Sequence, residues 1–208
     1  MAEQLPDIQL FGHPDSGHAC KIALALSLAG LEYSVRRIDI WAPPETRPAA
    51  FLSANPAAEV PVLLINGVAH VQSGAILLEI ATRFQCLGGE SWNGIRRGRE
   101  LLMWEANRIG MCLPQLKEAQ RVHGEGFPPG VVDWLTARFH ADCARFDMLL
   151  GDAPFFHGVS PGIGDCAVWG YTQWLEEAGV AGTPSMLAWI ERMRALPAMR
   201  NPDVFFPE

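Results

Sequence analysis

Positive charge is scarce in this chain. Only 16 of its 208 residues are Lys or Arg, against 23 Asp or Glu, so the formal net charge is −7 and the isoelectric point lies near 5.4. No run of Lys and Arg interrupts this acidic balance. Proteins that bind nucleic acid neutralise its phosphates with a basic face. The composition therefore predicts that nucleic acid is not a partner.

Long apolar runs are absent as well. No segment approaches the roughly 20 consecutive apolar residues that a membrane-spanning helix requires. Residues 1–7 are polar and acidic, unlike the basic start of a secretory signal. We therefore expect a cytoplasmic protein without a membrane partner. Hydrophobic residues still make up 49% of the chain and charged residues only 19%, which is enough to bury a sizeable core.

Paired cysteines are also missing. The number of cysteines is odd, they are widely spaced, and no Cys-x-x-Cys occurs. Disulfide frameworks and zinc ribbons both depend on paired spacings. We therefore predict no disulfide scaffold and no metal site, and interpret most of the cysteines as small core residues in a reducing compartment. They are Cys20, Cys86, Cys112, Cys143 and Cys166.

The first part of the chain mixes strand and helix patterns. Strands are predicted at 8–11, 33–40, 62–65 and 68–71, and helices at 17–31, 47–55 and 73–84. A helix between the first two strands implies that they are parallel. Asn66-Gly67 separates the last two strands and tolerates positive φ at both positions, which predicts a β-hairpin. These elements predict a small mixed sheet covered by helices.

Strand patterns disappear after Gly89. Helical periodicity runs over 95–122, 131–150, 165–178 and 185–194, and clusters of Gly and Pro interrupt it. The predicted fold class is therefore α/β followed by all-α. We expect one domain at residues 1–86 and an all-helical domain at residues 91–208, joined by a linker near 86–93.

A series of short motifs in the first part carries a family resemblance. The run Asn55-Pro-Ala-Ala-Glu-Val-Pro-Val-Leu is followed by the Asn66-Gly67 hairpin and then by Gln72-Ser73-Gly-Ala-Ile. In this order and spacing the chain resembles the soluble glutathione S-transferases. The opening Ser16-Gly-His with Lys21 resembles bacterial members of the family that use a serine, and Asp165 and Pro184 stand where its later helices begin.

The resemblance implies a thioredoxin-like domain followed by a helical bundle, in a homodimer. It also implies a detoxifying enzyme that conjugates the thiolate of glutathione, its co-substrate, to small hydrophobic electrophiles. Two other functions stay open. One is a glutathione-dependent thiol oxidoreductase or peroxidase, and the other is a non-catalytic member that binds ligands or proteins.

The resemblance assigns the glutathione site to two motifs. Val60-Pro61 would be a cis peptide that leaves the backbone of Val60 free to pair with the cysteinyl unit of glutathione. Gln72 and Ser73 begin a helix, whose N-terminal N–H groups favour a carboxylate. They would take the γ-glutamyl end. Glu59 departs from the family pattern, since many relatives carry Lys or Gln there, and its charge would repel the glycyl carboxylate.

Ser16 is the candidate catalytic residue. A hydroxyl that donates to the glutathione sulfur stabilises the thiolate, which is the nucleophile. Phe11 occupies the position at which other classes carry a tyrosine, and Cys20 lies about one turn deeper in the helix, where it favours packing. The alternative for Ser16 is that it only caps the helix. His13, His18 or the Gly17 amide would then donate to sulfur.

A second-substrate pocket is expected between the two domains. Trp104, Arg108 and Met111 lie on one stripe of the predicted 95–122 helix, and Trp41 and His13 would border the site from the first domain. Arg108 would meet an acidic substrate or glutathione itself, or pair with Glu105 or Glu100 on its own helix. The alternative is that the stripe belongs to the core.

Overall fold

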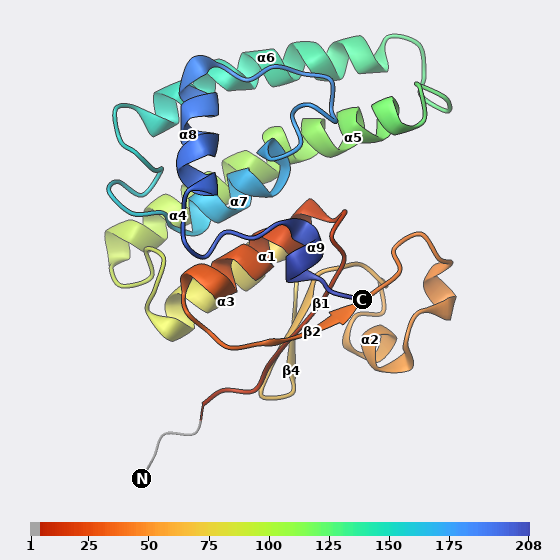
Figure 1. Cartoon of the computed structure of the whole chain (residues 1–208), viewed down its shortest axis with the longest axis vertical. Coiled ribbons are helices and arrows are strands. Elements are labelled where there is room, and N and C mark those ends of the chain that lie inside the picture. The colour runs from red at the N-terminus through yellow and green to blue at the C-terminus, as the bar shows by residue number, and fades with distance from the viewer. Residues whose placement is uncertain (1–4) are drawn as a thin grey trace.

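The computed structural model describes residues 5–208, which form a small sheet domain and a helical domain (Figure 1). The first four residues of the predicted 1–86 domain, on which the absence of a secretory signal partly rests, lie outside the described residues. The elements of the sheet domain, in chain order, are β1 Ile8–Gly12, α1 Gly17–Leu28, β2 Ser34–Arg37, a short 3-10 turn Pro44–Thr46, α2 Ala49–Ala54, β3 Val62–Ile65, β4 Val68–Val71 and α3 Ser73–Phe84.

The sheet has the order β2-β1-β3-β4. β1 and β2 run parallel, and the β1–β3 and β3–β4 pairs are antiparallel. Asn66 and Gly67 both have positive φ, so the predicted hairpin is confirmed. Figure 1 places α1 and α3 between the sheet and the helical domain. The predicted α/β class of this part is confirmed.

The two faces of the sheet are buried against different helices. Because successive side chains of a strand point to opposite faces, Leu10 and Leu63 join the main core, whereas Phe11 and Val62 pack with Phe51 of α2 in a smaller cluster. The main core continues through α1 and α3 into the helical domain. The two domains therefore share one continuous apolar core.

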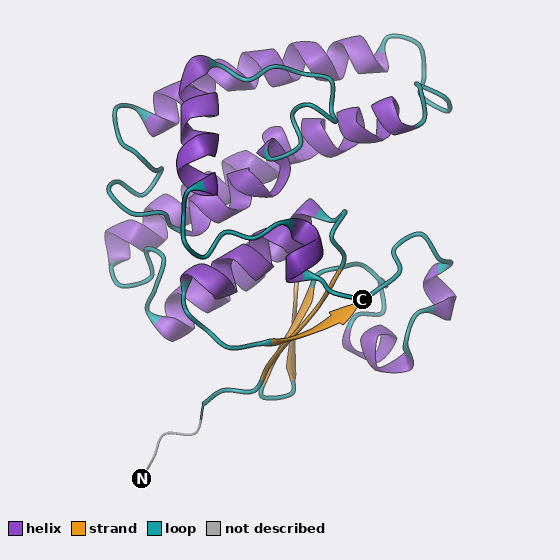
Figure 2. Ribbon diagram, in the orientation of Figure 1, coloured by secondary structure: helices purple, strands orange, loops and turns teal. Residues whose placement is uncertain are grey.

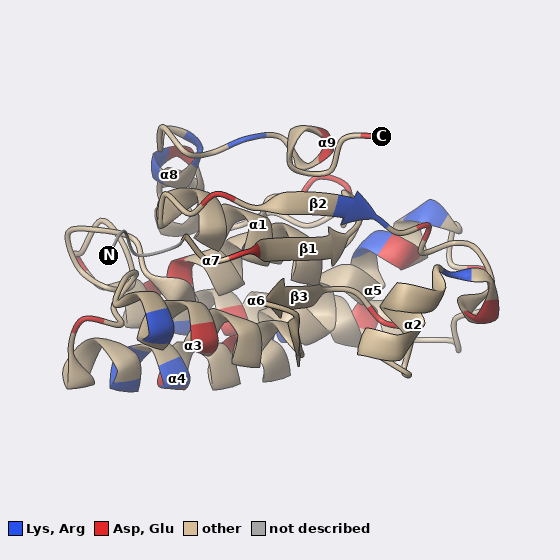
Figure 3. Ribbon diagram, turned by 90° about the horizontal axis from the view of Figure 1, so that it is seen from below, with Lys and Arg blue, Asp and Glu red and all other residues tan. Residues whose placement is uncertain are grey.

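The rest of the chain is helical (Figure 2). Within the described residues no helix is both long enough and apolar enough to span a bilayer. Along the ribbon in Figure 3, Lys and Arg positions are interspersed with Asp and Glu positions. The helices are α4 Trp92–Asn107, α5 Ile109–Arg121, α6 Val131–Leu150, α7 Ile163–Thr172, α8 Pro184–Arg194 and α9 Pro202–Phe205.

Two glycines let α1 and α7 touch backbone to backbone. A Cβ on Gly17 would lie 2.5 Å from the Gly170 carbonyl oxygen, and a Cβ on Gly170 would lie 2.7 Å from the Gly17 carbonyl oxygen. No side chain fits between helices that approach so closely. This contact fixes the start of α1 against the helical domain.

A buried ion pair also joins the domains. The Lys21 ammonium of α1 donates to both carboxylate oxygens of Glu105 on α4, each at 3.1 Å. The side chains are 1% and 3% exposed. Burial raises the pKa of the Glu105 carboxyl, and the Lys21 charge opposes that change. Removing either partner would therefore leave an uncompensated buried charge, which destabilises the fold.

Two helix predictions are wrong. Residues 95–122 form two helices, because the backbone at Arg108 leaves the helical conformation, with φ −126 and ψ −98. Pro114 lies inside α5, where it lacks an N–H and crowds the carbonyl four residues before it. The helix predicted at 165–178 spans 163–172 instead, and α9 was not predicted.

Candidate functional site

A cavity of about 420 Å³ lies where α1, α3 and the segment before β3 meet the helical domain. It brings together the five residues that the resemblance assigns to catalysis and to glutathione binding. Their roles in binding and catalysis stay predictions. They are Ser16, Val60, Pro61, Gln72 and Ser73.

Ser16 is the N-cap of α1. Its Oγ accepts a hydrogen bond from the Ala19 N–H at 3.2 Å, and its own N–H donates to the His13 carbonyl at 3.0 Å. Accepting a bond uses an oxygen lone pair and not the hydroxyl proton. Ser16 can therefore cap the helix and donate into the cavity at the same time.

The wall opposite is built by the segment before β3 and the start of α3. The Val60-Pro61 peptide is cis, as predicted. Gln72 caps α3 with positive φ, and its side chain makes no capping hydrogen bond. The N–H groups of the first turn of α3 therefore have no side-chain cap within residues 5–208, and a helix N-terminus of this kind favours an anion.

His18 connects the starts of α1 and α3. Its Nδ1 lies 3.1 Å from the Ser73 Oγ, and its ring meets the Tyr171 ring edge to face at 5.2 Å. Its ring lines the open cavity, but desolvation by the surrounding protein, with the Lys21 charge, lowers the pKa of His18 to about 4. His18 is therefore neutral near pH 7.

Arg47 contributes a positive charge to the same cavity. Its guanidinium donates to the carbonyls of Ala58 and Ile40, the latter at 3.0 Å, and so fixes the loop that carries Glu59. Glu59 itself is exposed. Arg47 and Glu59 therefore line the same cavity with opposite charges.

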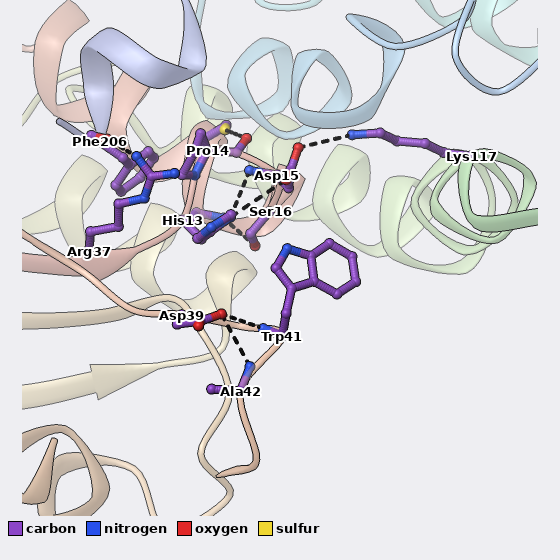
Figure 4. A network of polar contacts seen from close by, with 12 residues as sticks. His13, Pro14, Asp15, Ser16, Arg37, Asp39, Trp41, Ala42, Lys117 and Phe206 are labelled. Carbon is purple, nitrogen blue, oxygen red and sulfur yellow. Dashed lines mark hydrogen bonds and ion pairs between the residues drawn. The ribbon is translucent and has the colours of Figure 1, made fainter. Parts of the chain in front are cut away.

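A second cavity of about 230 Å³ adjoins the first and shares Asp15, Pro114 and Tyr171 with it. Of the five residues predicted for a second-substrate pocket, only Trp41 lines it. Two backbone N–H groups, of Trp41 and Ala42, donate to the Asp39 carboxylate at 2.9 and 3.1 Å and hold this loop (Figure 4).

His13 lines neither of these two cavities, so its assignment to a second-substrate pocket stays a prediction that they do not support. It is 6% exposed and begins the turn that ends at Ser16 (Figure 4). Its Nδ1 accepts from the Asp15 N–H at 3.1 Å, which requires a neutral ring. Burial lowers the pKa of His13, and the Arg37 charge adds to this, while Asp15, Asp39 and Asp203 oppose it.

The predicted stripe on the first long helix does not line these two cavities either. Trp104, Arg108 and Met111 line neither cavity, and the backbone leaves the helical conformation at Arg108, within the stripe. The Trp104 ring packs against Phe156. Arg108 lies 3.9 Å from the Asp142 carboxylate on α6, and not beside a glutamate of its own helix.

Several cavity residues escaped the sequence analysis. Arg47 had a usable signal, since no other Lys or Arg occurs between Arg37 and Arg83. Tyr171, Lys117 and Trp174 had none, because they come from separate helices and turns that only the fold brings together.

Cys20 is a packing residue, as expected. It is fully buried, its Sγ donates to the Pro14 carbonyl, and burial raises its thiol pKa to about 12. Within residues 5–208, no three His, Cys, Asp or Glu side chains gather as metal ligands would.

Comparison with known proteins finds the same architecture elsewhere. Residues 6–82 match the family model of the glutathione S-transferase N-terminal domain, and residues 113–192 match that of the C-terminal domain. A glutathione S-transferase from Pseudomonas fluorescens Pf-5 is 27% identical, with a TM-score of 0.77 over 94% of this chain and 98% of that chain.

Two further relatives are more distant or shorter matches. A glutathione transferase family member from Pseudomonas fluorescens Pf-5, with two glutathione molecules bound, shares the fold at 21% identity and a TM-score of 0.80, over 92% of this chain and 89% of that chain. The transcriptional regulator URE2 of Saccharomyces cerevisiae is 33% identical over 85 residues, which are 39% of this chain and 24% of that protein. The chain thus spans about a quarter of this curated relative's length.

Proposed function

Because this chain belongs to the glutathione S-transferase family, we propose that it is a glutathione transferase. It binds glutathione in the Ser16 cavity and joins the sulfur to a small electrophile held in the adjoining cavity. The single observation that carries the proposal is that Ser16 lines the cavity and that its cap leaves the hydroxyl proton unused. The glutathione bound in the related structure from Pseudomonas fluorescens supports the choice of co-substrate.

Glutathione carries a carboxylate at each end, and the cavity offers a group for each. The γ-glutamyl carboxylate meets the N-terminus of α3 at Ser73, with Gln72 beside it. The backbone of Val60 pairs with the cysteinyl unit. Arg47 takes the glycyl carboxylate, because a guanidinium recognises carboxylates well and offsets the repulsion of Glu59.

Ser16 activates the thiol. Its O–H donates to the sulfur, which favours the thiolate and lowers the thiol pKa, and the proton passes to solvent. The thiolate then attacks the electrophilic carbon. A C–S bond forms, and the leaving group departs with the electron pair of the broken bond. The positive end of α1 adds to the stabilisation of the thiolate.

Replacing Ser16 by alanine tests this role against simple capping. Ser91 provides a matched control, because it caps α4 by accepting from the Gly94 N–H at 3.1 Å and lies outside both cavities. Either Ser→Ala change should cost about 1 kcal/mol of stability through the lost cap. Only Ser16→Ala should also raise the thiol pKa of bound glutathione and lower kcat/KM, by about 10–1,000-fold.

The assay follows thiolate absorbance against pH and turnover of 1-chloro-2,4-dinitrobenzene. Equal activity of Ser16→Ala and Ser91→Ala would show that Ser16 is structural. The sulfur donor would then be the Gly17 amide or His18.

A non-catalytic binding protein is the second candidate. The observation that favours it is the match of the sheet domain to a protein described as a transcriptional regulator. A glutathione-dependent oxidoreductase or peroxidase is the third, and the missing Cys-x-x-Cys disfavours a dithiol cycle. Retention on immobilised glutathione without turnover of any electrophile, disulfide or peroxide would select the binding protein.

We also propose a homodimeric, cytoplasmic protein whose domains divide at residues 86 and 91. Exposed apolar side chains on β4 and α4, such as Val68 and Met103, support an apolar surface that a second copy covers. Light scattering at micromolar concentration tests the dimer, because a mass of 22.8 kDa would mean a monomer.

A further inference from the structure

The cavity beside the proposed glutathione site combines aromatic walls with charged groups. Trp41, Tyr171 and Trp174 supply the aromatic surface, and Leu113 and Pro114 add apolar area. A volume of about 230 Å³ suits a substituted ring better than a long chain. Flat aromatic surfaces stack favourably on indoles.

A cationic side chain of the protein lies over each of the two indole rings. The Lys117 ammonium lies 3.7 Å from the centroid of Trp174, and the Arg121 guanidinium lies 5.0 Å from that of Trp41. A cation on an aromatic face satisfies the negative potential of that face. A positively charged ligand would meet like charge at both indoles and is therefore disfavoured.

The two cations differ in what holds them. Arg121 makes two hydrogen bonds to the Glu118 carboxylate, at 2.7 and 2.5 Å, so its charge is paired. Lys117 makes no hydrogen bond to any residue within 5–208, and its nearest carboxylate oxygen, on Asp15, is 3.7 Å away. Its side chain is 25% exposed, whereas that of Asp15 is 51% exposed and well solvated.

The Lys117 ammonium has three N–H donors and no acceptor at hydrogen-bond distance within residues 5–208, so it can bind an anion. A carboxylate that enters the cavity can accept from Lys117 at the 2.7–2.9 Å typical of charge-assisted hydrogen bonds. Figure 4 shows Lys117 extended toward Asp15, next to Ser16, so an anion held by Lys117 lies in the cavity that adjoins Ser16. We propose that the electrophile of this enzyme is a flat aromatic compound that bears an anionic group, recognised by Lys117.

This inference rests on the proposed function and narrows its second substrate. For an aryl halide with a carboxylate, the glutathione thiolate attacks the ring carbon that carries the halogen. The C–S bond forms, the carbon–halogen bond breaks, and halide leaves with the electron pair. The thiol proton goes to solvent, so no oxidant or reductant is required.

A matched pair of probes tests the charge preference. 4-Chloro-3,5-dinitrobenzoate carries the anion, and 4-chloro-3,5-dinitrobenzamide is its neutral counterpart of nearly equal shape. The wild-type enzyme should show a KM for the benzoate roughly 10-fold lower than for the benzamide, as befits one partly exposed charge-assisted hydrogen bond. The preference should weaken with added salt.

Variants at Lys117 locate the preference. Lys117→Gln should abolish it by raising the KM of the benzoate alone, and Lys117→Arg should keep most of it. Arg194→Gln is the control for a change in net charge, because Arg194 lies on α8, pairs with Glu191 and lines neither cavity. It should leave both KM values unchanged.

Binding of 3,5-dinitrobenzoate, which cannot be conjugated, provides a readout that does not depend on turnover. Quenching of tryptophan fluorescence without glutathione should report a Kd that Lys117→Gln raises roughly 10-fold. Equal KM values for both probes, with turnover intact, would overturn the anion preference and leave the transferase function standing. Lys117-dependent quenching without turnover of either probe would overturn the transferase function instead.

Discussion

Replacing Lys21 by methionine should destabilise this protein more than any change at its surface. The substitution keeps an unbranched side chain, one atom shorter, but removes the ammonium that Glu105 contacts at 3.1 Å through both oxygens. Glu105 would then be an unpaired carboxylate that is 3% exposed. Breaking a buried ion pair in this way costs about 3–5 kcal/mol.

Urea denaturation measures the loss. With a slope of about 3 kcal/mol per molar, the midpoint should fall by about 1–2 M. The double variant Lys21→Met, Glu105→Leu removes both charges and should recover to within about 1 kcal/mol of the wild type, or exceed it, because a well-packed apolar pair needs no desolvation of charge.

The pH dependence gives an independent check. Burial already raises the pKa of Glu105 in the folded protein, and loss of Lys21 removes the charge that opposes this. A raised folded pKa favours the fold below the unfolded value of about 4.3, and that contribution is lost as pH rises through the folded pKa. The Lys21→Met defect should therefore be large at pH 7 and shrink toward pH 4.5. A single-variant cost below about 1 kcal/mol, or a double variant as unstable as the single, would refute this reasoning.

Three further outcomes follow from other contacts. His13→Leu should lower kcat/KM, because the Asp15 N–H loses its acceptor in the turn next to Ser16. It should also remove the His13 contribution to the loss of stability below about pH 6.5, since the lowered pKa of His13 favours its neutral form in the fold. An unchanged dependence of stability on pH would contradict this. Gly17→Ala places a Cβ 2.5 Å from the Gly170 carbonyl oxygen and should lower the free energy of unfolding by about 1–3 kcal/mol in urea denaturation. A Cβ on Gly74 would meet nothing within 4 Å, so Gly74→Ala should be neutral or slightly stabilising in the same assay. Asp165→Ala leaves three N–H groups without the buried carboxylate they contact at 2.9 Å, so the free energy of unfolding, measured by thermal denaturation, should fall by about 3–5 kcal/mol.

Local patterns predicted the elements whose conformation depends on neighbouring residues in the chain. Asn66-Gly67 specifies the hairpin through its own backbone preferences, and the strands on either side lie where alternation and turn residues placed them. The helices at 73–84 and 131–150 match their predicted bounds, because each presents a clear apolar face between turn residues. The two-part fold class followed from the loss of strand patterns alone.

The motif series also predicted which residues of the sheet domain meet at one cavity. Ser16, Val60 and Ser73 are far apart in the sequence, but each follows or begins an element whose place in the fold is set by the sheet. The order of such elements constrains where their ends lie. That is why the first cavity was predicted far better than the second.

Only the tertiary structure decided how the helical domain faces that cavity. Periodicity predicts that a helix has an apolar stripe but not what the stripe contacts, so Trp104 and Met111 were assigned to a pocket they do not line. Pro114 and Gly110 both lie in the helix that begins after the break at Arg108. A Cβ on Gly110 would meet the Glu105 carboxylate that pairs with Lys21. The second cavity, with Trp41, Lys117 and Trp174, exists because that packing brings a loop, a helix and a turn together across two domains, and energies of contact between distant segments leave no local trace in a sequence.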